Sequence, residues 1–284
     1  MARIDLHTHS TASDGTDTPA ELIKAAAVAE LDVVALTDHD TTAGWTPAAG
    51  ALPPGMTLIP GAEISCRWFG PDRRIGLHML AYLFDPEHPA FAAELARIRL
   101  ARENRAERMV GLIAADGVDI TWDEIRAFAA GGTVGRPHIA QALVRRGLVG
   151  SVSEAFASDW LGWRYRVPKE DLEVFAALRL IREAGGVAVF AHPRASSRGP
   201  IVPDTLIADL AAAGMTGIEA DHDDHSPAER AHVRALASDL GLLVTGSSDY
   251  HGSNKTVRLG ANLTAPAVLE RIVAAGTGSA PITG

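Results

Sequence analysis

Residues 33–39, with the sequence Val-Val-Ala-Leu-Thr-Asp-His, are the stretch on which the interpretation of the fold depends. The four apolar residues predict a short buried strand, and the change to Thr, Asp and His marks its carboxyl end. Residues 4–9, Ile-Asp-Leu-His-Thr-His, repeat this form. We therefore expect a fold in which buried strands end in side chains that can bind a metal.

Five more strands are predicted along the chain, at residues 57–64, 75–84, 187–190, 216–219 and 242–245. Helical patterns occupy residues 18–30, 169–184, 203–213, 226–240 and 264–274. Strands that alternate with helices are typical of βα units, so we expect an α/β fold with a mostly parallel sheet, open or closed into a barrel. The last eight residues are rich in Gly, Ser, Thr and Pro, and are expected to fray.

Residues 88–166 differ from the rest of the chain, because their patterns are helical and none predicts a strand. We expect a long helix at 91–115 and further helices that begin near Thr121, Arg136 and Ser151. The predicted organisation is a core formed by residues 1–87 and 167–284, with a helical insertion domain at 88–166 that acts as a lid over the substrate.

Composition limits the class of protein. The chain has 284 residues, 47% of them hydrophobic and 21% charged, which excludes a disordered chain or a coiled coil. No apolar run is long enough to span a bilayer. The net charge of −9 argues against duplex DNA as a partner but allows a small anionic substrate. The single Cys66 and the lack of a signal segment favour the cytoplasm.

Histidines and carboxylates gather at the predicted strand ends. Because the carboxyl ends of barrel strands converge on one edge, these side chains should meet there. Imidazole and carboxylate ligands together suit Zn, Mn or Fe. The candidates are His7, His9, His39, His78, His192, His251, Asp14, Asp38, Glu63 and Asp249.

Several of these stretches form a motif set. Residues 5–16, which contain His-Thr-His and Ser-Asp-Gly-Thr, and residues 36–41, Leu-Thr-Asp-His-Asp-Thr, resemble the first motifs of the PHP (polymerase and histidinol phosphatase) family. Residues 61–64, 191–193 and 246–251 resemble its later motifs. The resemblance covers residues 1–86 and 167–260.

Within that family, an insert that opens with Gly-Arg-Pro-His at 135–138 is similar to the TrpH/ribonuclease AM branch of small phosphoesterases. The resemblance implies a distorted (β/α)7 barrel and a centre of three divalent ions, Mn, Fe or Zn.

The resemblance also implies a ligand set. His7, His9, Glu63 and Asp249 match the first metal site. Glu63 would bridge to a second ion, completed by His78 and His192. The third site matches Asp14, His39 and His251. Asp249, His192 and Glu63 would then be central to hydrolysis of a phosphoester by a metal-bound hydroxide. Asp38 either orients His39 or caps the loop that follows it.

Basic residues and further histidines are candidates for substrate contacts. Arg136 begins a predicted helix, where free amides also favour an anion, and Lys169 lies in the segment that returns the chain to the core. Arg194, His222 and His225 follow strand ends and are weaker candidates. Each has a structural alternative, as a helix-terminal, solvated or hydrogen-bonded residue. His138 is more typical of a structural residue, and Trp160, Trp163 and Tyr165 of a core cluster than of a base-stacking surface.

The leading hypothesis is a metal-dependent phosphoesterase that removes phosphate from nucleoside 3′,5′-bisphosphates, mononucleotides or the ends of short single-stranded oligonucleotides. Histidinol-phosphate phosphatase is a second enzyme reading, against which the insert argues. A third is a non-catalytic metal-binding or polymerase-associated module, against which the complete ligand set argues. The sequence leaves the metal, the leaving group and the oligomeric state open.

Overall fold

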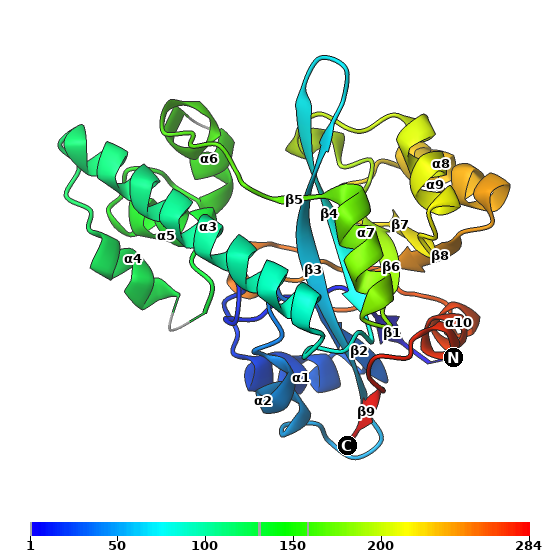
Figure 1. The fold of residues 1–284 in the computed structure, drawn as a ribbon. Helices are drawn as coiled ribbons and strands as arrows, with labels where there is room; N and C mark the ends of the chain where they lie inside the picture. Colours follow the sequence, from blue (N-terminus) through cyan, green and yellow to red (C-terminus); the bar gives the residue numbers. More distant parts are fainter. Residues whose placement is uncertain (1, 130–131, 158) are drawn as a thin grey trace.

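A curved, barrel-like sheet forms the centre of the computed structural model, which describes residues 2–129, 132–157 and 159–284 (Figure 1). The strands on its path are β1 (Ile4–Asp5), β2 (Val33–Leu36), β3 (Thr57–Phe69), β4 (Arg74–Tyr82), β6 (Val187–Ala191), β7 (Gly217–Asp221) and β8 (Leu243–Gly246), in that order. Neighbouring strands are parallel except β4, which runs antiparallel to β3 and β6. A bridge between Thr8 and Tyr250 brings the two ends of the sheet together. The α/β barrel prediction is confirmed.

The β3–β4 hairpin is longer than the sequence patterns predicted. β3 was expected to end at residue 64 but continues to Phe69, and β4 begins at Arg74. The two strands stay in register from Gly61 opposite Tyr82 to Phe69 opposite Arg74. The residues added to β3, from Ser65 to Phe69, mix polar and apolar side chains and pass from buried to exposed along the strand, so the apolar run used to find buried strands did not detect them.

Helices surround the sheet: α1 (Pro19–Val28), α2 (Trp45–Ala49), α7 (Val174–Glu183), α8 (Asp204–Ala212), α9 (Pro227–Leu240) and α10 (Pro266–Ala275). Thr18 and Glu21 form a capping box at the start of α1, as the sequence predicted. α2 was not predicted. α7 starts later than expected because residues Leu172–Glu173 form β5, which pairs with β3.

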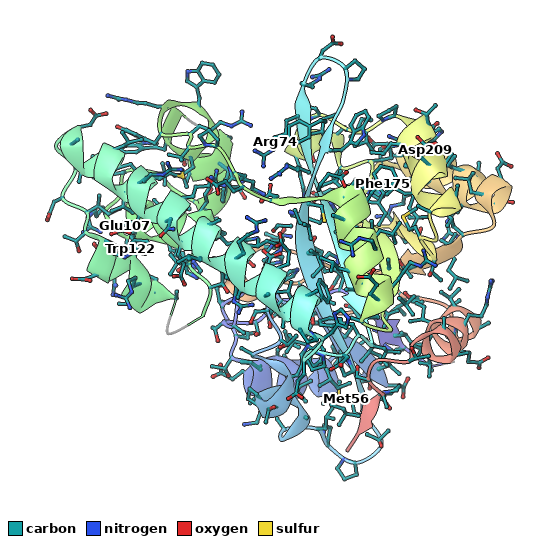
Figure 2. All side chains as sticks on the ribbon, in the orientation of Figure 1. Met56, Arg74, Glu107, Trp122, Phe175 and Asp209 are labelled. Atoms are coloured by element: carbon teal, nitrogen blue, oxygen red, sulfur yellow. The ribbon has the colours of Figure 1, made fainter. Side chains whose placement is uncertain are left out.

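The insert contains α3 (Pro89–Ala115), α4 (Trp122–Phe128), α5 (Arg136–Arg145), α6 (Val152–Ala157) and a π-helical turn at Asp159–Arg164. Its helices enclose a hydrophobic core of their own, to which Met109 and Ile113 belong. The first half of α3 packs elsewhere, because Phe91 and Leu95 lie in the core of the barrel. Figure 2 shows Glu107 and Trp122 far out on the insert, away from Met56 below the barrel.

The prediction that the last eight residues fray is wrong. Residues Ile282–Thr283 form β9, which pairs with Thr57 and Leu58 at the beginning of β3. The amide of Gly284 also donates to the carbonyl of Met56. Both termini lie at the end of the molecule opposite the tip of the hairpin (Figure 1). No helix in the described part of the chain is both long and apolar enough to cross a membrane.

Candidate metal centre

The nine predicted ligands come together at the carboxyl end of the barrel. His7 and His9 follow β1, His39 follows β2, and Asp249 and His251 follow β8. All nine are buried or largely buried. The donor atoms form three groups, and within each group all of them lie within 4.8 Å of one another. The groups are His7, His9, Glu63 and Asp249; His39, Glu63 and His78; and His9, Asp14, His39 and His251.

The first group is the tightest. The Nε2 atoms of His7 and His9 lie 3.0 Å apart. Glu63 Oε2 is 3.3 Å from the first and 3.1 Å from the second. Asp249 Oδ1 is 3.4 Å from both. Two nitrogens and two oxygens that face one point form a ligand set that suits a divalent transition metal.

Glu63 joins the first group to the second. Its other oxygen, Oε1, lies 2.7 Å from His78 Nδ1 and 3.0 Å from His192 Nε2. His39 connects the second and third groups, with Nδ1 3.2 Å from Glu63 and Nε2 3.7 Å from Asp14. The sites are therefore contiguous, as a cluster of ions with shared carboxylates requires.

The polar atoms of the centre fit metal ions better than they fit each other. The Nδ1 atoms of His39 and His78 are buried and make no hydrogen bond with another described residue, although each lies near a Glu63 oxygen. A buried nitrogen without a partner is costly. A cation between each nitrogen and the carboxylate would satisfy both, so the residues fit the implied metal.

Burial also favours the form of histidine that binds metal. It lowers the pKa of His192 to about 3 and of His251 to about 4. Both rings are neutral near pH 7, which leaves a nitrogen lone pair free for a ligand bond. His7 and His9 differ. The charges of Glu63 and Asp249 outweigh burial and hold the pKa of His7 well above its usual value, and hydrogen bonds to Asp249 and Glu63 raise the pKa of His9 to about 9.

Two further carboxylates support the centre. Glu219, inside β7 and fully buried, contacts His7 Nδ1 at 3.2 Å and accepts from the His192 amide and from Ser247 Oγ. Although burial opposes it, the positive field of His7 lowers the pKa of Glu219 to about 2. Such partners orient metal-ligating histidines. The sequence analysis overlooked Glu219, although an acid inside a short apolar strand is a usable signal.

Asp38 binds a different loop from the one considered for it: the loop after β1 and not the loop that follows Asp38 itself. Its oxygens accept from the amide and hydroxyl of Ser10 and from the hydroxyl of Ser13. These contacts hold the loop that carries Asp14.

Two ligands have a strained backbone. His192 has a φ of 30° and Asp249 a φ of 53°, in the left-handed region that disfavours side chains with a Cβ. Residues held in this region cluster at functional sites.

Cations that the sequence analysis missed lie beside Asp249. Its outer oxygen, Oδ2, accepts from Lys255 Nζ at 2.6 Å and from Arg198 Nη2 at 2.7 Å. His222 Nε2 is 3.2 Å from the same oxygen, and its Nδ1 accepts from the Asp224 amide, so Nε2 carries the proton. The loop after β6 supplies Arg198, and only the folded chain brings it to β8.

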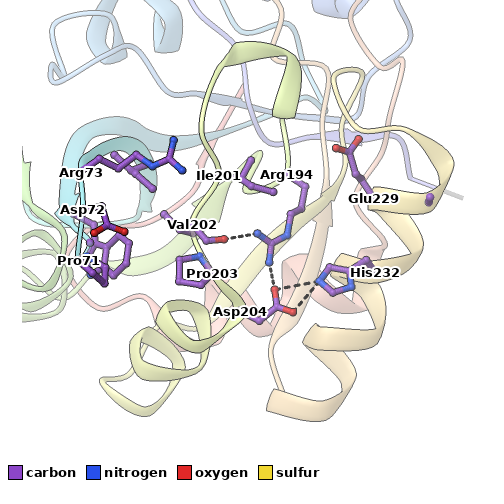
Figure 3. A pocket seen from close by; sticks show the side chains of 14 residues that line it. Pro71, Asp72, Arg73, Arg194, Ile201, Val202, Pro203, Asp204, Glu229 and His232 are labelled. Atoms are coloured by element: carbon purple, nitrogen blue, oxygen red, sulfur yellow. Dashed lines mark hydrogen bonds and ion pairs between the residues drawn. The ribbon is translucent and has the colours of Figure 1, made fainter.

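The predicted substrate residues fall in different places. His222 lies at the centre, as described. His225 is buried with both ring nitrogens on backbone groups, the Ala220 carbonyl and the Arg194 amide. The Arg194 guanidinium pairs with Asp204 and the Val202 carbonyl (Figure 3). Neither side chain contacts the metal-ligating groups.

Arg136 and Lys169 belong to a second set, which we call the cationic cluster: Arg102, Arg105, Arg136 and Lys169. Burial lowers the pKa of Lys169 to about 8, of Arg105 to about 9 and of Arg136 to about 10, and the cations lower each other further. Within residues 2–129, 132–157 and 159–284, neither Arg105 nor Arg136 forms an ion pair with a carboxylate. The Arg136 guanidinium lies 4.9 Å from the Phe156 ring.

Asp171 is the carboxylate whose charge reaches every member of this cluster. It contacts Lys169 at 3.8 Å and Arg74 at 3.3 Å. Arg102 reaches the opposite way, to Asp40 at 2.8 Å, next to His39. The cluster therefore adjoins the metal-ligating residues and has excess positive charge.

The structure places the other insert residues away from the predicted ligands or inside the insert core. His138 is buried, and its Nδ1 accepts from the Gly135 amide at the start of α5. Trp160 and Tyr165 pack with the insert core, whereas Trp163 is 76% exposed.

Comparison with known proteins identifies the family. A PHP domain matches residues 5–188. A 5′-3′ exoribonuclease of Haemophilus influenzae is 36% identical over 92% of this chain and 94% of its own length. A 3′,5′-nucleoside bisphosphate phosphatase of Chromobacterium violaceum is 36% identical over 88% of both chains. A solved structure from Bifidobacterium adolescentis, provisionally named a metal-dependent phosphoesterase, superposes with a TM-score of 0.91 at 36% identity, covering 96% of both chains.

The match in sequence and in fold extends over nearly the whole chain, and the motif residues are those that form the centre. The chain belongs to the PHP domain family.

Proposed function

We propose that the protein is a metal-dependent phosphoesterase that removes phosphate from nucleotides with a second phosphate, as in nucleoside 3′,5′-bisphosphates, or from the ends of short single-stranded oligonucleotides. One observation carries the proposal: a cluster of four cations, contacted among the described residues by the two carboxylates Asp171 and Asp40, adjoins the predicted set of metal ligands. A substrate with two anionic groups matches this pair of sites.

The metal-ligating residues would hold three divalent ions, Mn, Fe or Zn, with Glu63 shared between two of them. Such ions neutralise phosphate charge and lower the pKa of a water molecule. Hydrolysis forms a bond from a water oxygen to phosphorus and breaks the ester bond, and the leaving oxygen takes a proton. Asp249, His192 and Glu63 keep the reacting region in place.

Arg198 and Lys255 support binding of the reacting phosphate. Both point their charged atoms at Asp249 Oδ2, next to the first group of ligands. A phosphate oxygen at this edge would receive two charge-assisted hydrogen bonds. His222, which carries its proton on Nε2, adds a third donor on the same side.

Arg136 and Lys169 would bind the phosphate that is not cleaved. Arg136 starts α5 and is held against Phe156, so its guanidinium is oriented before substrate arrives. A preorganised cation in a partly buried site loses little entropy when it binds an anion. The insert at 88–166, which carries Arg102, Arg105 and Arg136, would then act as the substrate domain.

Histidinol phosphate carries a cationic amine where the bisphosphate has its second anion, and the excess positive charge of the cluster disfavours that amine. A purely structural metal site would not need the buried excess of positive charge that the cationic cluster places beside it. The single buried Cys66 favours a reducing compartment, and we propose the cytoplasm.

The test is phosphate release with added Mn²⁺ from a panel: a nucleoside 3′,5′-bisphosphate, a mononucleotide, a 5′-phosphorylated oligonucleotide, histidinol phosphate and p-nitrophenyl phosphate. We expect the highest kcat/KM on a substrate with two phosphates. A preference for histidinol phosphate would establish the second enzyme reading, and no release from any substrate would favour a binding module.

A further inference from the structure

The β3–β4 hairpin carries aromatic and basic side chains beyond the metal centre. Glu63, in the middle of β3, is a metal ligand, and Phe69 lies six residues further along the same strand. At 3.4 Å per residue, Phe69 is about 20 Å along the strand from Glu63. The hairpin rises between the insert on one side and α8 and α9 on the other (Figure 1).

The tip has the composition of a surface that binds single-stranded nucleic acid. Residues 67–74, Arg-Trp-Phe-Gly-Pro-Asp-Arg-Arg, contain three arginines and one acid in a chain with a net charge of −9. Phe69 is 62% exposed, and the Arg67 guanidinium lies 5.5 Å from its ring. Aromatic rings next to cations bind bases by stacking and phosphates by charge.

The turn at Gly70 positions the rings of Trp68 and Phe69. The Gly70 amide donates to the Arg73 carbonyl, which closes the turn. A Cβ at residue 70 would lie 2.7 Å from the Trp68 ring, so glycine lets the indole fold over the turn. This arrangement fixes Trp68 as one wall of a groove and leaves Phe69 on the outside.

The groove beside the tip has a volume of about 820 Å³, and Trp68, Arg73, Ile201 and Pro203 contribute to its walls. Figure 3 shows Arg73 on one wall and Ile201 and Arg194 on another. Two acids of the groove are occupied locally: Asp204 pairs with Arg194 and His232, and Glu229 accepts from Ser196 Oγ and the Ser226 amide. The third acid, Asp72, is exposed at the tip. Arg73 is exposed and has no ion-pair partner in the described part of the chain.

The groove and the cationic cluster lie on different sides of the hairpin. The cluster adjoins β3 through Asp171 and β5, whereas Ile75 of β4 and the loop 193–203 form the groove. The same loop carries Arg198, which contacts Asp249. A chain with one phosphate in the cluster and the next at the metals would therefore continue toward the groove.

We propose that the tip of the β3–β4 hairpin and this groove form a platform for the nucleotides of a single-stranded oligonucleotide beyond the reacting phosphate. Phe69 and Trp68 stack on bases, and Arg73 contacts the backbone. The inference deepens the proposed function, because it assigns a site that a nucleoside bisphosphate does not reach but a longer chain does.

Two substrates test the platform: a nucleoside 3′,5′-bisphosphate and a 5′-phosphorylated hexanucleotide RNA, each assayed with Mn²⁺. We expect Phe69→Ala to lower kcat/KM on the hexanucleotide about 5- to 100-fold, from the strength of base–aromatic stacking, and to change it less than about twofold on the bisphosphate. Phe69→Trp keeps a stacking ring and should restore the hexanucleotide value. Arg73→Ala should raise KM on the hexanucleotide only.

Equal losses on both substrates, or no loss on the hexanucleotide, would overturn the platform. A second measurement separates it from the proposed function. In the Asp249→Asn variant, where turnover is slow, anisotropy of a fluorescent hexanucleotide reports binding directly. Phe69→Ala in this background should raise Kd about 5- to 100-fold. An unchanged Kd overturns the platform even if the enzyme is inactive, whereas inactivity on all phosphoesters with a raised Kd overturns only the proposed reaction.

Discussion

The metal centre and the cationic cluster adjoin each other but are built in different ways. All the predicted ligands of the centre except Asp14 lie on a barrel strand or within a few residues of one, and buried carboxylates such as Glu219 contact the rings. The cluster draws on α3, α5 and the return segment before β5, three elements that meet only when the insert has folded. In the proposed function the centre would supply the chemistry, whereas the cluster would select the substrate.

The largest effect that would sharpen this comparison is expected at Glu63. Glu63→Ala removes a ligand from two of the predicted metal sites. It also removes the negative charge that lets two cations lie close together. Because changes behind the ligands already cost 10- to 100-fold, we expect a loss of kcat of at least about 1,000-fold on every substrate. Metal analysis after purification with excess Mn²⁺ should fall from about three ions per chain to one. Full wild-type activity with one ion or fewer would contradict the three-ion centre.

Asp249→Asn should have the next largest effect, because it weakens one ligand and leaves the others. We expect kcat to fall by about 100- to 1,000-fold, more than for a residue behind the ligands. The melting temperature should stay near wild type, since the apolar strands and not this edge form the core. Asp239→Asn on exposed α9 is the matched control. Near-normal turnover with a full metal content would exclude Asp249 as a ligand.

Glu63 and Asp249, on which these two predictions rest, could be found from the sequence, because the pattern that reveals such residues lies in a few adjacent positions. A buried strand followed at once by His or Asp fixes both the burial and the direction of the side chain, as at His39. Glu219, Arg198 and Lys255 were missed because their roles depend on which strands and loops become neighbours. The end of β3 was missed for a related reason: its upper half is stabilised by pairing with β4 and not by an apolar run.

Arg136→Ala tests whether the cluster acts on selection alone. Loss of a charged contact in a partly closed site costs on the order of 2–4 kcal/mol, or about a 30- to 1,000-fold drop in kcat/KM for a nucleoside bisphosphate. p-Nitrophenyl phosphate lacks the second phosphate and should be affected much less. Equal losses on both substrates would mean that Arg136 acts on the reacting phosphate, and the distinction between the two regions would fail.

Lys169 makes the same distinction through pH. Burial lowers the pKa of Lys169 to about 8. The charge of Asp171 acts in the opposite direction, and the charges of Arg102, Arg136 and Arg105 lower the pKa further. Because the lysine loses its charge as the pH rises through 8, KM for the bisphosphate should rise about tenfold between pH 7 and 9. Lys169→Arg keeps its charge throughout and should flatten the profile. A rise in KM that persists in Lys169→Arg would assign the titration to another group.

The smallest effect on activity is expected at Arg194, which lies outside both regions. Its guanidinium is committed to Asp204 and the Val202 carbonyl. Arg194→Ala should change kcat/KM less than about twofold, and lower the free energy of unfolding by about 1–3 kcal/mol through the lost charged hydrogen bonds. Urea denaturation together with steady-state kinetics would show this. A selective loss of activity at unchanged stability would restore Arg194 as a substrate residue.

α3 has a mechanical consequence for how substrate enters. The helix is 27 residues long, about 40 Å, and is anchored at one end in the barrel and at the other in the insert. Because one continuous helix is packed in both cores, we expect no hinge between the barrel and the insert at the start of α3. Substrate would then enter through bending of α3 or through rearrangement of the loops around it. Arg102 and Arg105 lie between the two packed ends of α3, so bending would move their side chains. A phosphate bound to both would oppose that bending and stiffen the helix.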